Sequence, residues 1–360
     1  MEVGGRFWPA RGATEKSSKR GCRAHGKHTD GDEQATTELT VVELVSTLQA
    51  PMSDASDPER DSPAHQYLVP RVSVPEDVLV GIRSPEEVLA LALAVFRETG
   101  QVLAVCAFSH LDDRGDGRMR LPRGQAVCAA HLHHISSFML GLARLVDVRG
   151  AQEVGHVLSR CIFEAVVNVR FLMRKGDPAL FERFMRSGLG PERELYELIM
   201  RNIAARGGSV QQIETRMLTS IRSVCQESGL RIEELDPKPG DWAGNLRQRM
   251  EALQLPDHYV SLQRLPSHAM HATWTYLVVN HLRYHSDGYE LETRQREIDA
   301  RLLTPVACMV VDAARDYLTT FLGDHAAARP LYERLDDLTA RLRTVDRLHE
   351  GIMQRDFIAE

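Results

Sequence analysis

Apolar residues recur every three to four positions along most of the chain, which is the spacing that places them on one face of an α-helix. The pattern predicts helices over about 85–99 with a continuation over 102–111, and over about 123–147, 152–174, 178–205, 208–228, 242–253, 267–285, 291–322 and 328–355. No long stretch of alternating β-branched residues, typical of a half-buried strand, interrupts them. The sequence therefore predicts an all-α fold, a multi-helix bundle.

The clearest helix start is Ser84-Pro85-Glu86-Glu87. Ser84 can cap the helix, and Pro85 suits the first helical position because no backbone donor is needed there. Glu87 can return a hydrogen bond to the cap amide, which completes a capping box. We expect a helix to begin at Pro85 and to bend at Gly100.

Composition divides the chain into four parts. Residues 1–66 have few aliphatic side chains, too few to offset the entropy lost on folding, so we expect a disordered amino-terminal tail. A helical extension follows over 67–122, a helical core domain over 123–325 and a last helix over 326–360. Basic residues precede acidic ones in the tail, which indicates either a solvated segment or an arm that binds nucleic acid.

The last helix carries an approximate heptad pattern of apolar residues with charged residues between them. The apolar positions are Leu331, Leu335, Leu338, Leu342, Val345 and Ile352. Two interpretations remain open: a homodimer seam through the carboxy-terminal helix, or packing of this helix against its own bundle.

Charge and composition narrow the class of protein. A net charge of −6 argues against a surface devoted to nucleic-acid backbone, although a local basic patch could still bind RNA. Charged residues near the amino terminus come before any apolar run, so no secretory signal region is expected. No apolar run approaches the roughly 20 uncharged residues that a membrane span requires. The six cysteines form no CxxC pair, which favours reduced thiols. We expect a cytoplasmic protein that does not associate with membranes.

Two short motifs lie within the core domain. The first is Arg160 followed by Glu164, inside the run from Val157 to Leu172. The second consists of Tyr259, Ser267, His268 and His271. Both resemble segments of a bacterial helical family, domain of unknown function family 5677 (DUF5677). The resemblance covers about 123–325; it implies an all-α fold and brings no established activity.

Arg160 and Glu164 are one helical turn apart and can pair, with Asn168 one turn further at the edge of the apolar face. One interpretation is a structural ion pair that joins this helix to another. The other is an internal polar pocket for a small ligand or a partner, because large polar groups are costly to bury without partners. Tyr259 and His268 are candidates for the same polar region.

The segment 267–285, taken as one helix, places several side chains on one face. These are His271, Trp274, Val278, His281 and His285. His281 and His285 could share a metal ion, but no HExxH sequence or cysteine pair supplies further ligands. We therefore expect no metal and no other cofactor.

Arg264 and His271 provide an enzymatic alternative. Their spacing is similar to that of the catalytic Arg and His in HEPN (higher eukaryotes and prokaryotes nucleotide-binding) ribonucleases, which need no metal. A histidine can transfer the proton of a ribose hydroxyl while an arginine stabilises the charge on phosphorus. Leu265 and Pro266 depart from that pattern.

The leading hypothesis remains a cytoplasmic helical protein in which Arg160, Glu164 and His271 organise either the bundle interior or a polar pocket for a small ligand or partner. The alternative is a ribonuclease in stress or phage defence.

Overall fold

The computed structural model describes residues 69–74, 76–110, 120–236, 240–255, 258–292 and 296–359; nothing is stated for the side chains of 76–78 and 355–359. Helices dominate this part of the chain, which confirms the all-α prediction. The tail predicted for residues 1–66 lies outside the described residues.

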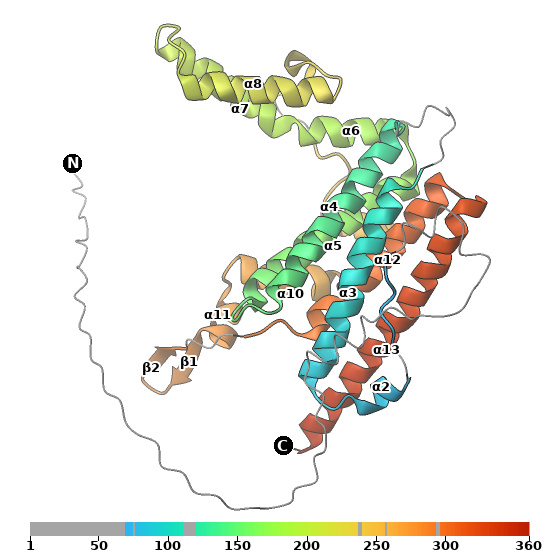
Figure 1. The fold of residues 1–360 in the computed structure, drawn as a ribbon. Coiled ribbons are helices and arrows are strands. Elements are labelled where there is room, and N and C mark those ends of the chain that lie inside the picture. The colour runs from blue at the N-terminus through green and yellow to red at the C-terminus, as the bar shows by residue number, and fades with distance from the viewer. Residues whose placement is uncertain are drawn as a thin grey trace, which may run out of the picture. The chain divides into compact units, whose positions relative to one another are not determined.

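Five long helices form a central bundle (Figure 1). They are α3 (Pro85–Phe108), α4 (Arg123–Leu145), α5 (Gln152–Lys175), α12 (Ala300–Phe321) and α13 (Arg329–Ala359). Helix α3 packs against α4, α12 and α13, and α5 packs against α4 and α12. Their facing apolar sides merge into one core, in which Phe96, Phe163 and Tyr317 are among the largest fully buried side chains. The short helices α2 (Glu76–Gly81) and η5 (Ala326–Ala328) precede α3 and α13.

Helix α3 begins as the sequence predicts. The Ser84 hydroxyl accepts a hydrogen bond from the Glu87 amide, and the Glu87 carboxylate accepts one from the Ser84 amide. The helix continues without a break through Gly100, where a bend is predicted, and ends at Phe108. At Gly100 a Cβ atom would lie 3.3 Å from the Met139 Cβ on α4. This glycine therefore allows two helices to approach closely.

A second, smaller core joins the helices that follow α5. Helices α6 (Pro178–Gly188), α7 (Gly190–Ala205) and α8 (Gln212–Glu227) precede the turn η3 (Ile232–Glu234). Their shared core consists of Leu189, Ile199, Leu218, Ile221, Cys225, Ile232 and Leu235. The single helix predicted over 178–205 is wrong: it breaks at Leu189, two residues before Pro191, which has no backbone donor to continue a helix.

The next part of the chain consists of short elements. They are α9 (Leu246–Ala252), the π-helix η4 (Tyr259–Arg264), α10 (Leu265–Met270), α11 (Trp274–Asn280), and the strands β1 (Leu282–His285) and β2 (Gly288–Leu291). The helix predicted over 267–285 is wrong. Ala272 adopts a φ of 44°, which ends α10, and a two-residue turn at Ser286 and Asp287 closes an antiparallel hairpin. The helix predicted over 291–322 begins only at Ala300, where the Asp299 side chain caps α12.

A buried charge network ties the first described residues to the first and last long helices of the bundle, α3 and α13. The carboxylate of Glu98 on α3 accepts two hydrogen bonds of 2.6 Å from the Arg341 guanidinium on α13. It also accepts the Val72 amide at 2.9 Å, and it lies 3.0 Å from Arg334 Nε. Arg341 donates to the carbonyl of Val72 and to Asp337. The charges are therefore buried as a paired group, in which Arg334 Nε makes an ionic contact with Glu98 but no hydrogen bond within the described structure.

The heptad residues of α13 face the core of their own chain. All six of these apolar side chains are at most 6% exposed, and α13 packs against α3 and α12. The surface that the sequence suggested for a homodimer seam is thus occupied within one chain. Whether the protein forms a homodimer through other residues stays a prediction.

Two helices, α3 and α4, pass a test of length and hydropathy for a membrane span. In the described structure, 72% of the most apolar window of α3 and 44% of that of α4 is buried. Both helices contribute apolar side chains to the core of the central bundle, so packing within the fold accounts for their hydropathy.

The five cysteines in the described part of the chain are free, as the sequence predicts. Burial raises the pKa of Cys106 and of Cys128 to about 12. These thiols therefore stay protonated near neutral pH and are poor nucleophiles.

Candidate functional site

Polar side chains form a stripe along α5, on the side that packs against α9, η4 and α10. The stripe consists of Glu153, His156, Arg160, Glu164 and Asn168. Their spacing of three to four residues keeps them within an arc of about 120°. We call this stripe and the side chains that face it from 241–281 the polar seam. It contains the motif that the sequence singled out on α5.

Arg160 is a link between helices and not the partner of Glu164. No ion pair joins these two residues in the described structure. The Arg160 guanidinium contacts the Met270 sulfur at the end of α10. When the Gln263 amide is oriented with its oxygen toward Arg160, that oxygen accepts hydrogen bonds from Nε at 3.0 Å and from Nη2 at 3.2 Å. Arg160 therefore fastens α5 to η4 and α10.

The carboxy-terminal end of the seam is organised around Arg249 on α9. Its guanidinium lies over the Trp242 ring at 4.8 Å and donates to the Gly244 carbonyl. Burial lowers the pKa of Arg249, and the carboxylates of Asp241 and Glu164 oppose that shift. Glu164 thus interacts with Arg249 through charge. The Oδ1 atom of Asn168 is buried without a hydrogen-bond partner in the described structure.

At the other end of the seam lie four side chains that interact with Glu153 or with one another, which we call the amino-terminal polar group: Glu153, His156, Tyr276 and His281. His281 Nε2 lies 2.7 Å from the Glu153 carboxylate, and the rings of Tyr276 and His281 are 5.9 Å apart. Glu153 also acts electrostatically on both His156 and Tyr276. Glu153 and His281 are partly exposed, so the group reaches solvent.

Two atoms of this group are buried without a hydrogen-bond partner among the described residues: His156 Nδ1 and Tyr276 Oη. Leaving such an atom unsatisfied costs about 1–3 kcal/mol, so native structures normally supply a partner. Tyr276 carries no clear sequence signal, because it lies in the apolar run of α11. His281 was considered only as a member of a helical face with His285, and His285 instead pairs with Glu290 in the hairpin.

Burial keeps both unpartnered groups neutral. It raises the pKa of Tyr276 to about 12, and the Glu153 carboxylate adds to the shift. Burial lowers the pKa of His156, against the opposing effect of Asp299 and Glu153. At neutral pH the amino-terminal polar group therefore offers a neutral phenol and a neutral imidazole for hydrogen bonding.

The lowered pKa of His156 predicts a loss of stability in mild acid. An unfolded histidine titrates near pH 6.5, so below that value the unfolded state binds a proton that the folded state binds less readily. The contribution of His156 is present above about pH 6.5 and is lost as the pH falls. In urea unfolding between about pH 7.5 and about pH 5.5, we expect His156→Gln to lose less stability on acidification than the unaltered protein does.

His131, whose pKa burial also lowers, supplies the comparison. His131→Gln should flatten the same curve independently, because this histidine lies on α4. An unchanged slope in His156→Gln would contradict the assigned burial of His156.

The residues of the ribonuclease hypothesis lie apart from the seam. Arg264 and His271 flank α10 at its two ends, about 10 Å apart along the axis at 1.5 Å per residue. Both are exposed, and within the described structure neither side chain makes a hydrogen bond or an ion pair. The hypothesis stays a prediction that rests on spacing alone.

Tyr259 and His268 make local contacts. The Arg247 guanidinium lies 5.9 Å from the centre of the Tyr259 ring. His268 Nδ1 lies 2.7 Å from Thr273 Oγ1 and so fixes the turn that follows α10. These two candidates therefore support the elements that cover α5.

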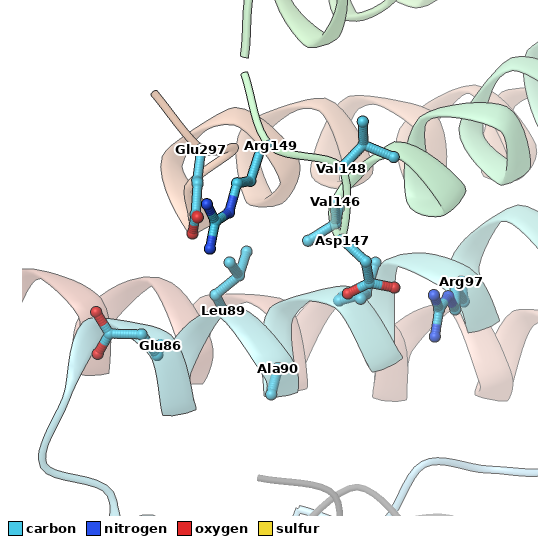
Figure 2. A pocket seen from close by; sticks show the side chains of 10 residues that line it. Glu86, Leu89, Ala90, Arg97, Val146, Asp147, Val148, Arg149 and Glu297 are labelled. Carbon is cyan, nitrogen blue, oxygen red and sulfur yellow. The ribbon is translucent and has the colours of Figure 1, made fainter. Parts of the chain in front are cut away.

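A cavity of about 430 Å³ lies near the start of α5, between α3 and the end of α4. Figure 2 shows the side chains of Arg149 and Glu297 reaching toward Leu89, in a lining of mixed charge around an apolar floor. The Gln152 amide bonds the Arg296 carbonyl nearby, yet no residue lines both this cavity and the amino-terminal polar group. No buried unpartnered atom marks the cavity, so we favour the polar group as the site.

Metal binding finds no support in the described part of the chain, where no three His, Cys, Asp or Glu side chains are placed to hold one ion. The site is therefore described by hydrogen bonding alone.

Comparison with known proteins places the seam within a family. Residues 126–289 match the family model DUF5677, described as a family of unknown function. No curated protein and no solved structure matches the chain. The matched range contains α5 and the residues that face it, including all four members of the amino-terminal polar group. Residues 126–289, a little less than half of the chain, are therefore similar to the family of unknown function DUF5677.

Proposed function

We propose that the protein binds a small polar molecule at the amino-terminal polar group. The unpartnered His156 Nδ1 and Tyr276 Oη carry this proposal, because one ligand that bonds both would remove two desolvation penalties. The partly exposed pair of Glu153 and His281 offers a route from solvent to these buried atoms.

The charges around the group define the class of ligand. Glu153 and Asp299 both act on His156. Glu153 acts on Tyr276 more strongly than the opposing Arg296, and the phenol and imidazole are neutral. Negative charge near the site disfavours a phosphate or carboxylate and favours an uncharged or cationic molecule with hydrogen-bonding edges, such as a nucleoside or an amine. A cytoplasmic location belongs to the same proposal and is supported by the free, mostly buried cysteines.

Tyr276→Phe separates binding from folding. Without ligand, removing a buried hydroxyl that has no partner should leave the melting temperature unchanged or raise it. With nucleosides or polyamines as probes, the same substitution should reduce the stabilisation that the probe gives to the unaltered protein. Thermal unfolding with and without each probe measures both effects, and nucleoside monophosphates serve as the disfavoured, negatively charged comparison.

Tyr317→Phe is the matched control. The Tyr317 hydroxyl donates to the Ser109 carbonyl and accepts from Gln125, so its loss should destabilise the protein by about 0.5–1.5 kcal/mol and leave probe binding intact. If Tyr276→Phe destabilises as much as Tyr317→Phe and no probe stabilises the unaltered protein, the hydroxyl serves an ordered water and the binding proposal fails.

A further inference from the structure

The hairpin of β1 and β2 has one apolar face and one charged face. Leu282 pairs with Leu291 and Tyr284 with Tyr289, and paired residues point to the same side of an antiparallel sheet. On the opposite side, Arg283 pairs with Glu292 at 3.1 Å. Apolar and charged residues thus alternate along each strand, which is typical of a strand pair that buries one face.

The apolar face is uncovered in the described structure. Trp274 from α11 extends it: its ring meets that of Tyr289 edge to face at 5.5 Å, and Tyr284 meets Tyr289 at the same distance. The members of this aromatic face and their exposed fractions are Trp274 59%, Tyr284 68%, Tyr289 53% and Leu291 78%. An isolated two-stranded hairpin is marginally stable in water and gains from packing against another surface.

We propose that this aromatic face is covered by the same face of a second copy of the chain. In a two-fold symmetric dimer the same surface of each copy forms the contact, so a charged side chain near the symmetry axis would face the same charge in the other copy and be repelled. The aromatic face carries none, because the charges of the hairpin lie on the other side and are paired there: Arg283 with Glu292, and His285 with Glu290. The surface is therefore self-complementary and offers nothing to a phosphate backbone.

The exposed area fits a weak dimer. An aromatic side chain presents about 150–250 Å², so the exposed fractions of these four residues sum to roughly 500 Å² in each copy. Two copies would bury about 1,000 Å², the lower limit for a specific interface. We therefore expect a reversible dimer whose dissociation constant is micromolar. This interface involves none of the α13 heptad residues and no member of the amino-terminal polar group.

Sedimentation of the full chain over low to high micromolar concentrations tests the proposal. The average molar mass should rise with protein concentration from that of one chain toward that of two. Leu291→Lys should weaken the dimer at least about tenfold, because a charge would enter a desolvated apolar contact. Trp274→Ser should act in the same direction by removing an aromatic anchor. Leu291 is mostly exposed, so circular dichroism of Leu291→Lys should be unchanged.

Leu198→Lys on α7 is the matched control, since Leu198 is 45% exposed and lies on a helix of the second, smaller core. It should dimerise as the unaltered protein does. A chain that remains monomeric at the highest concentration overturns the proposal, as does equal weakening by Leu198→Lys. Binding of the monomer to phosphatidylcholine vesicles, abolished by Trp274→Ser, would instead assign the aromatic face to a lipid surface and would also overturn it.

Discussion

Arg341→Ala should lower the free energy of unfolding by about 3–5 kcal/mol, the cost of removing one partner from a buried ion pair. Arg341 is 6% exposed and supplies both hydrogen bonds of 2.6 Å to Glu98. Without it, the Glu98 carboxylate keeps only the Val72 amide and Arg334 while remaining out of water. The Val72 carbonyl also loses its donor. Urea or thermal unfolding measures the loss.

Arg329→Ala provides the comparison on the same helix. Arg329 pairs with Glu333 at 3.0 Å, but both side chains are largely exposed, so the change should stay within about 0.5 kcal/mol. If Arg341→Ala cost no more than Arg329→Ala, the Arg341 contacts would contribute little, and the first described residues would be held by their other contacts, such as Arg334 with the Val69 carbonyl.

Leu342→Ala should cost about 2–5 kcal/mol by leaving a cavity in the core. Leu342 is fully buried at a heptad position of α13, facing the bundle of its own chain. The loss should therefore be the same at low and high protein concentration, because no second chain is involved in that contact. Chemical unfolding at two concentrations measures it.

Met353→Ala is the control for this substitution, since Met353 lies on α13 and is partly exposed. It should change stability by much less than Leu342→Ala. If Leu342→Ala left the unfolding free energy unchanged but abolished dimerisation, the heptad residues would form an interface between copies and not a contact within one chain.

The long helices could be predicted because their apolar spacing and local signals agree. Ser84, Pro85 and Glu87 define the start of α3, and the structure contains the predicted capping box. The predicted helices differ from the structure where a local turn interrupts the helical period. The turn at Ser286 and Asp287, followed by Gly288, separates two short strands, yet the apolar run before it continues the helical period. Gly100 was expected to bend α3, whereas its lack of a side chain serves contact with α4.

The candidate site was predicted only in part. Arg160 and Glu164 could be found because they stand out on an apolar helix, and their side of α5 does form a seam. Their partners could not be foreseen: Gln263, Met270 and Arg249 meet α5 through tertiary packing that no sequence period encodes. Tyr276 is indistinguishable from a core residue until its hydroxyl is seen to be buried without a partner.

The place of α3 in the bundle has a consequence for the boundaries of the family. The matched range of 126–289 contains most of α4 and all of α5, but the helices that bury their apolar sides, α3 and α12, lie outside it. The unit recognised by sequence similarity is therefore not the unit that folds. A homologue that kept the range 126–289 would need substitutes for α3 and α12, and those substitutes need share no sequence with these helices.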